Sequence, residues 1–563
     1  MIIGIDLGTT NSLVSIWKDS KSILIKNPLG SVVTPSVVGV DDDGRIIVGQ
    51  PAKDRLLTHP DRTVAIFKRL MGSNASIKIA DLVLKPQELS SFILKQLKED
   101  VEIQLGESVT EAVITVPAYF NDTQRKMTKL AGRLAGLKVE RLLNEPTAAA
   151  LAYGLHEEND NEILVFDLGG GTFDVSVLEL FDGVMEVRAS AGNNRLGGED
   201  FTRSIAQYFT DQLNHDGLIS SDITSKLEPK ILAEAERAKV CLSTHQEYLS
   251  HIILDEHEVA LSITRQKFES ICESLLNQLQ QPILQALNDS SIAPNQLDHI
   301  LLVGGATRMP VISKLVTKMF GAFPNKSLDP DQAIVMGAAI QAALKSQDES
   351  INEVVLTDVC PYTLGIEVVA DTYESKLVQG VFSPIIERNN TIPTSKVQTY
   401  YTVHDLQEKI DIKVFQGESR STANNIYLGG VSVEVAKSPA GHQSVDVRFS
   451  YDTNGLLEIE TLVVNTGEKK SSLINTGGDE LNDEQMNDSL TKLQSLKIHP
   501  RESIENTSVL YRANRLYEQN MGKKRELVGG LVDFFTSVLE SGDEERINSV
   551  REQVSRELDQ YEL

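Results

Sequence analysis

Two segments of this chain repeat one design, in which an aspartate at the end of a strand is followed by leucine and a glycine turn. The segments read IDLGTTN at residues 5–11 and FDLGGGTFD at residues 166–174. Glycines let backbone amides approach phosphate oxygens, threonine hydroxyls add donors, and aspartates can hold a hydrated magnesium ion. One such turn alone is as often an ordinary turn. Two copies, each opening a β-rich run, predict a duplicated fold whose halves bind one nucleotide from opposite sides.

Residues 1–350 alternate apolar β-rich runs with longer amphipathic stretches, which predicts an α/β layered domain. We expect strands at residues 112–116 and 163–166 and helices at residues 88–105 and 122–137. Asp122 is expected to cap the backbone amides of the helix that it begins.

The remainder of the chain changes its hydrophobic period twice. Residues 351–358 are a short apolar stretch bounded by charge, which predicts an interdomain linker. Residues 359–478 show a period of two, for example at 409–414 and 444–449, which predicts an antiparallel β domain. Residues 479–563 show helical spacing and are expected to form a small bundle. Its apolar stripes include Leu527, Leu531, Phe534, Val538, Ile547, Val550, Val554 and Leu558.

Charge, cysteine content and hydropathy exclude several classes of protein. The chain has 54 Lys and Arg against 80 Asp and Glu, a net charge of −26, which argues against nucleic-acid binding. Cys241, Cys272 and Cys360 are widely spaced and suggest neither a disulfide framework nor a zinc site. We find no signal peptide and no apolar run of membrane-spanning length, so we expect a cytoplasmic enzyme with no membrane partner.

Two further elements favour a nucleotide site. A strand at residues 299–303 runs into the glycine turn Gly304-Gly305, followed by a helix start, where the backbone can lie close to a flat or charged ligand. Glu236, Lys239 and Ser243 fall on one face of a predicted helix at residues 228–243. Taken alone, that face would more often be solvated surface.

Five long signatures resemble the seventy-kilodalton heat-shock (DnaK-like) chaperone family. They are IGIDLGTTNS at 3–12, VPAYFNDTQR at 116–125, NEPTAAALAYG at 144–154, FDLGGGTFDVSVLE at 166–179 and LVGGATRMP at 302–310. The resemblance runs through nearly the whole chain. It implies an α/β actin-like (ribonuclease-H-like, duplicated) two-lobed ATPase domain, an antiparallel β-sandwich that binds peptide, and a short helical lid. It also implies that ATP binding and hydrolysis allosterically control the grip on exposed hydrophobic segments of unfolded proteins.

The resemblance implies roles for individual residues at the nucleotide site. Asp6, Glu145, Asp167 and Thr172 match the site around Mg²⁺ and the terminal phosphate of ATP, with Asp6 and Asp167 reaching the metal through water. Lys68 matches the catalytic lysine, although a lysine in such a segment is usually at the surface. The residues that match contacts to ATP or ADP are Thr9, Thr10, Asn11, Gly169, Gly170, Gly171, Gly197, Gly198, Glu236, Lys239, Ser243, Gly304, Gly305 and Arg308.

The resemblance also assigns a relay and a docking site. Pro117 and Arg125 match a relay between the nucleotide and the linker. Arg141 and Asp358, with Val355 in the linker, match residues associated with interdomain coupling and with the docking of a J-domain co-chaperone. The alternatives are that Pro117 merely ends a strand and that the two charges are solvated surface.

A third set matches the peptide-binding cleft of the β domain, where an extended client would be held by backbone hydrogen bonds. Its members are Ile366, Val368, Val369, Tyr400, Val403, Ile410 and Ile412. The alternative is that several of these side chains belong to the core of the domain.

Some features depart from the common family member. The chain from Gly72 to Pro86 and the stretch from Ser243 to Thr264 are short, Thr357 replaces the last apolar linker residue, and the helical region is short. These features resemble the HscC-like bacterial branch, predict faster peptide release, and argue against a dedicated nucleotide exchange factor. A metabolite kinase or a filament-forming protein on the same fold would leave the β domain and the linker unexplained. A co-chaperone with little hydrolysis would not need the intact catalytic set.

Overall fold

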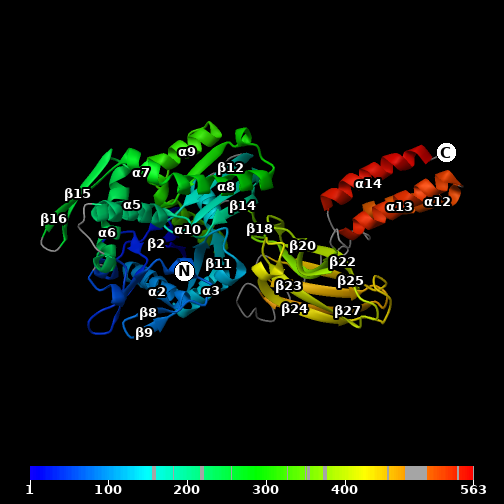
Figure 1. The fold of residues 1–563 in the computed structure, drawn as a ribbon, viewed down its shortest axis with the longest axis horizontal. Coiled ribbons are helices and arrows are strands. Elements are labelled where there is room, and N and C mark those ends of the chain that lie inside the picture. The colour runs from blue at the N-terminus through cyan, green and yellow to red at the C-terminus, as the bar shows by residue number, and fades with distance from the viewer. Residues whose placement is uncertain are drawn as a thin grey trace. The chain divides into compact units, whose positions relative to one another are not determined.

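The computed structural model divides the chain into two compact units, residues 1–361 and 362–563 (Figure 1). We describe each unit by itself. The structure describes all residues except 57, 155–159, 182, 216–220, 255–256, 326, 349, 352–354, 372–376, 453–455, 476–503, 521, 542–543 and 562–563.

The first unit contains two large mixed sheets. The first has the order β11 (Lys138–Asn144), β10 (Glu111–Val116), β1 (Ile2–Leu7), β2 (Asn11–Lys18) and β3 (Lys21–Leu24), and β4 (Thr34–Pro35) pairs with β2. The second has the order β17 (His299–Val303), β12 (Asn161–Leu168), β13 (Phe173–Phe181), β14 (Val184–Asn193) and β18 (Val355–Val359).

The two sheets repeat one topology. In each, three consecutive strands are antiparallel, and a later strand pairs in parallel with the first of the three: β10 with β1, and β17 with β12. Each repeated turn joins the first two of these strands, and four residues separate the last paired positions, Leu7 with Ser12 and Leu168 with Phe173. The mixed α/β content predicted from the sequence is therefore present, and the topology has the internal repeat that the two turns suggest.

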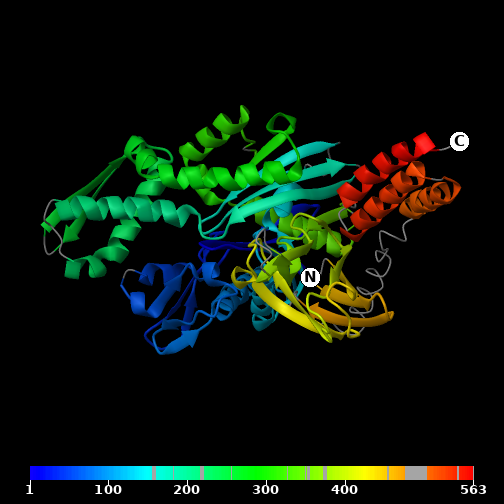
Figure 2. The same cartoon turned by 45° about the vertical axis from the view of Figure 1, so that its right-hand side comes forward.

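Smaller sheets and helices surround these sheets. The small sheets are β6 (Ile46–Val48), β5 (Val37–Val40) and β7 (Thr63–Ala65); β8 (Ile77–Ile79) and β9 (Leu82–Leu84); and β15 (Glu247–Leu254) and β16 (His257–Thr264). The helices are α1 (Gln50–Arg55), α2 (Pro86–Leu105), α3 (Asp122–Leu134), α4 (Glu145–Ala152), α5 (Gly198–His215), α6 (Ser221–Leu242), α7 (Arg265–Ile271), α8 (Glu273–Ser290), α9 (Pro310–Phe320) and α10 (Ala333–Lys345). The β15–β16 hairpin lies at the end of the group formed by α5, α6 and α7 (Figure 1, Figure 2).

Capping at the start of α3 differs from the prediction by one residue. The Oδ1 atom of Asn121 accepts a hydrogen bond from the backbone amide of Gln124 at 2.9 Å, so Asn121 is the cap. Asp122 is the first helical residue, where its negative charge still favours the positive end of the helix dipole. The prediction that Asp122 caps the helix was wrong because Asn and Asp are about equally good caps and they are adjacent here.

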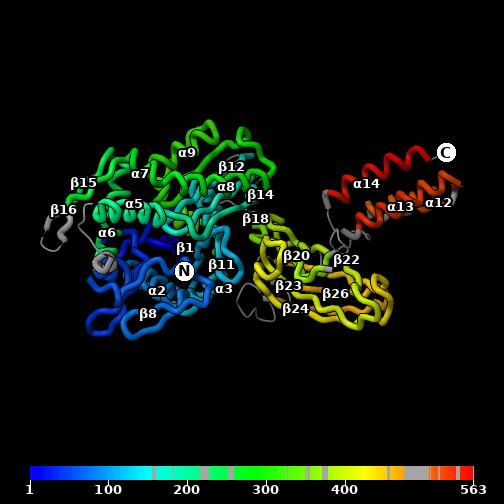
Figure 3. Tube along the Cα trace, viewed as in Figure 1, coloured from blue at the N-terminus to red at the C-terminus, as the bar shows by residue number. Residues whose placement is uncertain are grey.

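The second unit contains two four-stranded antiparallel sheets that pack against each other (Figure 3). One has the order β20 (Leu377–Ile386), β19 (Leu364–Asp371), β23 (Lys409–Gln416) and β24 (Ile426–Glu434), and the other β22 (Thr394–Tyr401), β25 (Ser444–Tyr451), β26 (Leu456–Val463) and β27 (Glu468–Asn475). The short strand β21 (Thr391–Ile392) precedes β22. Alternate residues of β25 and β26 are fully buried, among them Val445, Val447 and Phe449, as period-two patterning predicts.

Three helices follow: α12 (Ile504–Gln519), α13 (Lys523–Ser541) and α14 (Glu544–Leu558). All four predicted apolar residues of the last stripe, Ile547, Val550, Val554 and Leu558, are buried. On α13 the prediction holds for Val538, which is buried, and for Leu531, which packs half-buried against the same core. It fails for Leu527 and Phe534, which are 57% and 42% exposed, whereas their neighbours Val528 and Phe535 are buried. Residues 479–503 of the predicted lid lie outside the described part of the chain.

No helix within the described ranges is both long enough and apolar enough to span a bilayer.

One loop of the second unit has a strained conformation that can be tested. Leu406 has a φ of 57° and is 65% exposed, so it adopts a left-handed conformation without burying its side chain. Asn tolerates this conformation better than Leu, and we expect Leu406→Asn to raise the free energy of unfolding by about 1 kcal/mol. Chemical denaturation measures the change. Leu29→Asn is the control, because Leu29 is 66% exposed and has no positive φ, and an equal gain there would contradict the explanation.

Candidate functional site

The two repeated turns of the first unit lie against each other. A Cβ atom built on Gly170 would come 1.8 Å from the hydroxyl oxygen of Thr10, and one on Gly171 would come 2.4 Å from Cγ2 of Thr9. Only glycine permits this approach. Thr9 is buried, whereas Thr10 and Asn11 are exposed, so the structure brings the predicted phosphate-binding residues of both sheets to one place.

The segment Gly197-Gly198 packs on the second turn. The backbone amide of Gly198 donates to the carbonyl of Gly169 at 2.9 Å, and the amide of Glu199 donates to the carbonyl of Gly170 at 2.9 Å. The turn itself is closed by a hydrogen bond from the amide of Gly169 to the carbonyl of Thr172 at 3.1 Å. Three glycine-containing backbone segments therefore converge beside the strand ends that carry the aspartates.

Buried carboxylates gather beneath these turns. Asp6, Glu145 and Asp167 are 8%, 6% and 5% exposed. Burial, followed by repulsion from Glu145, raises the pKa of Asp6 to about 7. The same two causes raise the pKa of Asp167 well above its usual range. These groups are therefore close enough to oppose one another's ionisation.

Lys68 is the cation of this cluster. It lies in the 3₁₀ turn η2 (Phe67–Leu70), is only 4% exposed, and places its Nζ 3.2 Å from Oε1 of Glu145 and 5.5 Å from the centre of the Phe120 ring. Ile66, just before the turn, has a φ of 62°, an uncommon conformation for a β-branched residue. Since Lys68 is buried and paired, the alternative of a surface lysine is excluded.

The residues at this position fit a hydrated magnesium ion. Mg²⁺ prefers oxygen ligands and keeps several of its waters, so it is held by a few carboxylates at some distance. When ionised, the three carboxylates carry more negative charge than the single positive charge of Lys68 can balance. A divalent cation would offset the mutual repulsion of Asp6, Asp167 and Glu145. Within the described part of the chain, Oδ2 of Asp167 is buried and accepts no hydrogen bond, which leaves it available to a metal-bound water.

Sequence reasoning missed three residues of this site. Asp174, opposite Asp167 in the β12–β13 ladder, is 2% exposed, and burial raises its pKa to about 8. The side chain of Arg69 donates from Nε to the carbonyl of Gly171 at 2.8 Å and from Nη2 to Asp200 at 2.5 Å. Asp174 could have been found from its place at the start of a β-rich run, two residues after Thr172 of the glycine turn. Nothing local distinguishes Arg69 or Asp200 from surface charges.

Of the three predicted residues at the end of α6, Lys239 is mostly buried, at 12% side-chain exposure, whereas Glu236 is 49% exposed and Ser243 follows the last residue of the helix. Nζ of Lys239 donates to the carbonyl of Gly198 at 3.0 Å and lies 2.7 Å from Oε2 of Glu236. Ser243, just after the helix, donates to the carbonyl of Lys239 at 3.3 Å. A Cβ on Gly198, the residue that Lys239 contacts, would lie 3.2 Å from Cβ of Ala306, so the start of α5 meets the turn at 304–308.

The third glycine turn lies against the second. Gly304 has a φ of 84°, and a Cβ atom there would come 2.4 Å from the carbonyl oxygen of Leu168. The following turn η5 (Gly305–Arg308) ends on Arg308, which is bonded to Asp329 and Asp331. All predicted nucleotide-binding segments are thus neighbours within the first unit.

The predicted relay residues are connected to the linker by one unexpected side chain. Nη2 of Arg125 donates to Oδ1 of Asn144 at 2.7 Å, and Nδ2 of Asn144 donates to Oδ1 of Asp358 at 2.7 Å. Nε of Arg125 also donates to the carbonyl of Phe120 at 3.1 Å, and the backbone amide of Phe120 donates to the carbonyl of Pro117 at 3.1 Å. Arg125 therefore holds the turn after β10 in place.

The linker residues form part of the second sheet. Val355 pairs with Val184 in β14, and Val355 remains 54% exposed. Arg141 and Asp358 are half-buried rather than solvated, and burial lowers the pKa of Arg141 while Asp358 opposes the change. Residues 352–354 of the predicted linker lie outside the described residues.

The predicted peptide-binding residues lie in or beside the sheets of the second unit. Ile366 in β19 and Ile412 in β23 are almost fully buried, at 3% and 2% exposure. Val368, Val369, Val403 and Ile410 are half-buried, and β19 is irregular next to Val369. The hydroxyl of Tyr400 bonds Ser383 of β20 at 3.0 Å and Gln398 at 2.7 Å. The core alternative therefore suits Ile366 and Ile412 best.

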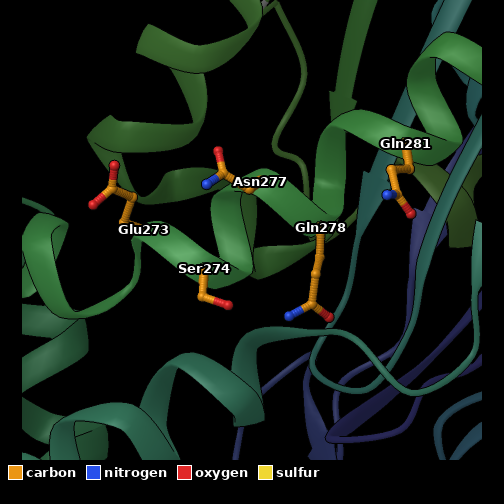
Figure 4. Close-up of a pocket in the computed structure, with 5 residues that line it drawn as sticks. All are labelled: Glu273, Ser274, Asn277, Gln278 and Gln281. Atoms are coloured by element: carbon orange, nitrogen blue, oxygen red, sulfur yellow. The ribbon is translucent and has the colours of Figure 1, made fainter.

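A separate pocket of about 440 Å³ lies along α8 and holds none of the predicted site residues. Figure 4 shows its lining residues, Glu273, Ser274, Asn277, Gln278 and Gln281. All five are exposed side chains of one helix, so the pocket is a shallow surface feature.

The sequence is similar to known proteins over most of its length. The family description "Hsp70 protein" matches residues 2–562. The chaperone protein DnaK of Thermosipho melanesiensis is 42% identical over 497 residues, which cover 86% of this chain and 82% of that relative. The chaperone protein DnaK of Thermotoga neapolitana is 43% identical over 495 residues, which cover 86% and 81%.

The imbalance of buried charge predicts opposite effects of two substitutions on the ligand-free protein. Lys68→Met removes the cation paired with Glu145 and should lower the free energy of unfolding by about 2 kcal/mol or more. Glu145→Gln removes one of several mutually repelling carboxylates and should raise stability. Thermal unfolding without nucleotide measures both. Equal destabilisation by the two substitutions would show that the ion pair, not the carboxylate repulsion, dominates.

Proposed function

This chain belongs to the Hsp70 family, and on that premise we propose that the convergent glycine turns and buried carboxylates of the first unit are its ATPase site. The protein is an ATP-dependent chaperone that binds unfolded proteins, hydrolyses ATP to ADP and phosphate, and uses Mg²⁺ with its nucleotide. We further propose which residues bind and hydrolyse ATP and how ATP binding is coupled to client binding.

One observation carries the site assignment. The two repeated turns, which come from different sheets and are more than 150 residues apart in sequence, touch at Thr9, Thr10, Gly170 and Gly171, directly above the cluster of Asp6, Glu145, Asp167 and Lys68. Backbone amides in such turns can bind phosphate oxygens, and a water-excluded charge cluster next to them can act on the terminal phosphate.

The roles of the side chains follow from their charge and burial. Bound Mg²⁺ neutralises phosphate charge. The Lys68 ammonium, held by Glu145, can orient water and offset charge that develops during phosphoryl transfer, which depends more on positioned charge than on covalent help. Asp6 and Asp167 hold the hydrated metal through water, and Thr172 presents its hydroxyl at the second turn. Arg69 bridges Gly171 and Asp200 and keeps this turn in place.

We assign the remaining parts by their sheets and by the family. Residues 1–350 form the two-lobed actin-like ATPase domain, residues 351–358 the linker, residues 359–478 the peptide-binding β-sandwich and residues 479–563 the helical lid. The half-buried residues Val368, Val369, Val403 and Ile410 are the best candidates to contact a client, because a side chain must be partly accessible to bind one.

The linker strand reaches the catalytic cluster through one residue. Asn144 bonds Asp358 of β18, and its neighbour in sequence, Glu145, bonds Lys68. A change in the position of Glu145 on ATP binding therefore acts on the strand that leads to the second unit. Since both ligands bias the same equilibrium, a bound client alters nucleotide affinity or turnover.

Partners and location are proposals of the same kind. Hydrophobic segments of unfolded polypeptides are the clients, and a J-domain co-chaperone docks near Arg141 and Asp358. We also propose a cytoplasmic location, as for a DnaK-like chaperone.

Steady-state ATP hydrolysis with and without a short hydrophobic peptide tests the function. We expect the peptide to stimulate turnover, and Lys68→Ala to lower kcat at least about 100-fold in both conditions. A protein that hydrolyses no ATP, or a Lys68→Ala variant that retains wild-type turnover, would sink the site assignment.

Coupling is tested separately by Asn144→Ala. Loss of the Asn144 amide breaks the bond to Asp358, so peptide stimulation should fall to near one while turnover without peptide stays within about threefold. Asn27→Ala is the matched control, because it also removes a part-buried asparagine amide, one that donates to the carbonyl of Val33 at 3.2 Å. Full peptide stimulation in Asn144→Ala would show that the signal takes another route.

A further inference from the structure

A pair of aspartates that no sequence motif singled out holds the side chain of Arg308. Nε and Nη2 of Arg308 lie 2.9 Å and 2.8 Å from Oδ2 of Asp331, and Nη2 lies 2.5 Å from Oδ1 of Asp329. The two carboxylates therefore occupy one edge of the guanidinium and fix its plane. The hydrogen bonds to both aspartates outweigh partial burial and raise the pKa of Arg308, so the group is a permanent cation.

The aspartates are themselves placed on rigid backbone. The carbonyl of Pro330 accepts the amide of Gly304 at 2.9 Å, and the carbonyl of Asp329 accepts the amides of Gln332 and Ala333 at the start of α10. Oδ1 of Asp329 also accepts the amide of Asp331 at 3.0 Å. The segment 329–331 is thus tied both to the third glycine turn and to a helix packed against the first sheet.

Gly305 has a specific reason to be glycine here. A Cβ atom at this position would come 2.6 Å from Oδ1 of Asp331. The turn that carries Arg308 can therefore approach the aspartates only without a side chain at residue 305.

The held guanidinium lies beside the predicted adenosine residues. Ala306, two residues before Arg308, faces Gly198, to whose carbonyl Lys239 donates. Arg308 is about half exposed, at 48% of its side chain. An arginine whose edge is bonded to carboxylates can still stack its flat face on an aromatic base.

We propose that Asp329 is a positioning residue for nucleotide recognition: with Asp331 it holds the Arg308 guanidinium in the plane that stacks on the base of ATP. This inference rests on the proposed ATPase site and adds how the residue that stacks on the base is held in place. A free arginine must lose side-chain rotamer freedom on binding, and an arginine already held in place loses less, so the clamp increases affinity without touching the nucleotide.

Kinetics of the full chain with Asp329→Ala and Asp329→Asn test the proposal. We expect Asp329→Ala to raise KM for ATP about fivefold with kcat changed less than about twofold, because only binding of the base is weakened. Asp329→Asn keeps an acceptor oxygen for Arg308 and should restore most of the affinity. Asp43→Ala, at an exposed aspartate of the turn after β5, is the matched control.

Two further measurements distinguish weaker binding of the adenine base from a general loss of structure in Asp329→Ala. Inhibition by inorganic tripolyphosphate, which has the phosphates but no base, should be the same in Asp329→Ala and wild type. In an Arg308→Ala background, Asp329→Ala should cause no additional rise in KM, because the two residues act as a unit.

Weaker tripolyphosphate inhibition in Asp329→Ala, a fall in kcat equal to the rise in KM, an unchanged KM, or additive losses in the double variant would each overturn the inference. Failure of the wild-type chain to bind ATP would instead overturn the proposed function and remove the basis of this inference with it.

Discussion

The ion pair between Lys68 and Glu145 is the interaction on which the rest of the site depends. Both groups are buried beside three buried aspartates, Asp6, Asp167 and Asp174, whose pKa values are raised by burial and by repulsion from Glu145. Such a cluster is costly in a folded protein unless something offsets its charge, and Lys68 does so only in part. The site therefore sacrifices stability for function. The same imbalance that opposes folding favours a divalent cation and the nucleotide that carries it.

The residues around this ion pair come from different elements of the first unit. Glu145 begins α4 directly after β11 of the first sheet, Asp167 is the last residue but one of β12 in the second sheet, and Lys68 comes from a turn earlier in the chain, just after the left-handed residue Ile66. Asn144, adjacent to Glu145, contacts the linker strand. In the proposed coupling, a rearrangement of Glu145 would act through the adjacent Asn144 on the segment that leads to the second unit. The hydrogen bonds that hold Arg308 fix a second part of the site. The negative charge of Asp331, which makes some of these bonds, also contributes to the raised pKa of Asp6.

Much of this could be predicted from the sequence, for a physical reason that differs among residues. Each glycine turn is formed by residues that are close in sequence. Residues 5–11 and 166–174 therefore predicted both the turns and the phosphate binding proposed for them. The period-two and helical patterns likewise predicted the sheets and the last helix. The predictions went wrong where two choices differ little in energy. Asn121 and Asp122 are near-equal caps, and on α13 the predicted Leu527 and Phe534 are exposed while the adjacent apolar residues Val528 and Phe535 are buried instead.

By itself the sequence determined the local elements, the repeated turns and the identity of the charged groups that a phosphate site requires. It could not determine which charged side chains would be buried together. Arg69, Asp200, Asn144 and Asp329 look like surface residues, and each gains its partner only through a contact between segments that lie far apart in the chain. Tertiary structure decided these pairings because electrostatic interactions depend on distance and burial, and both are set only when the two sheets and their helices pack around one another.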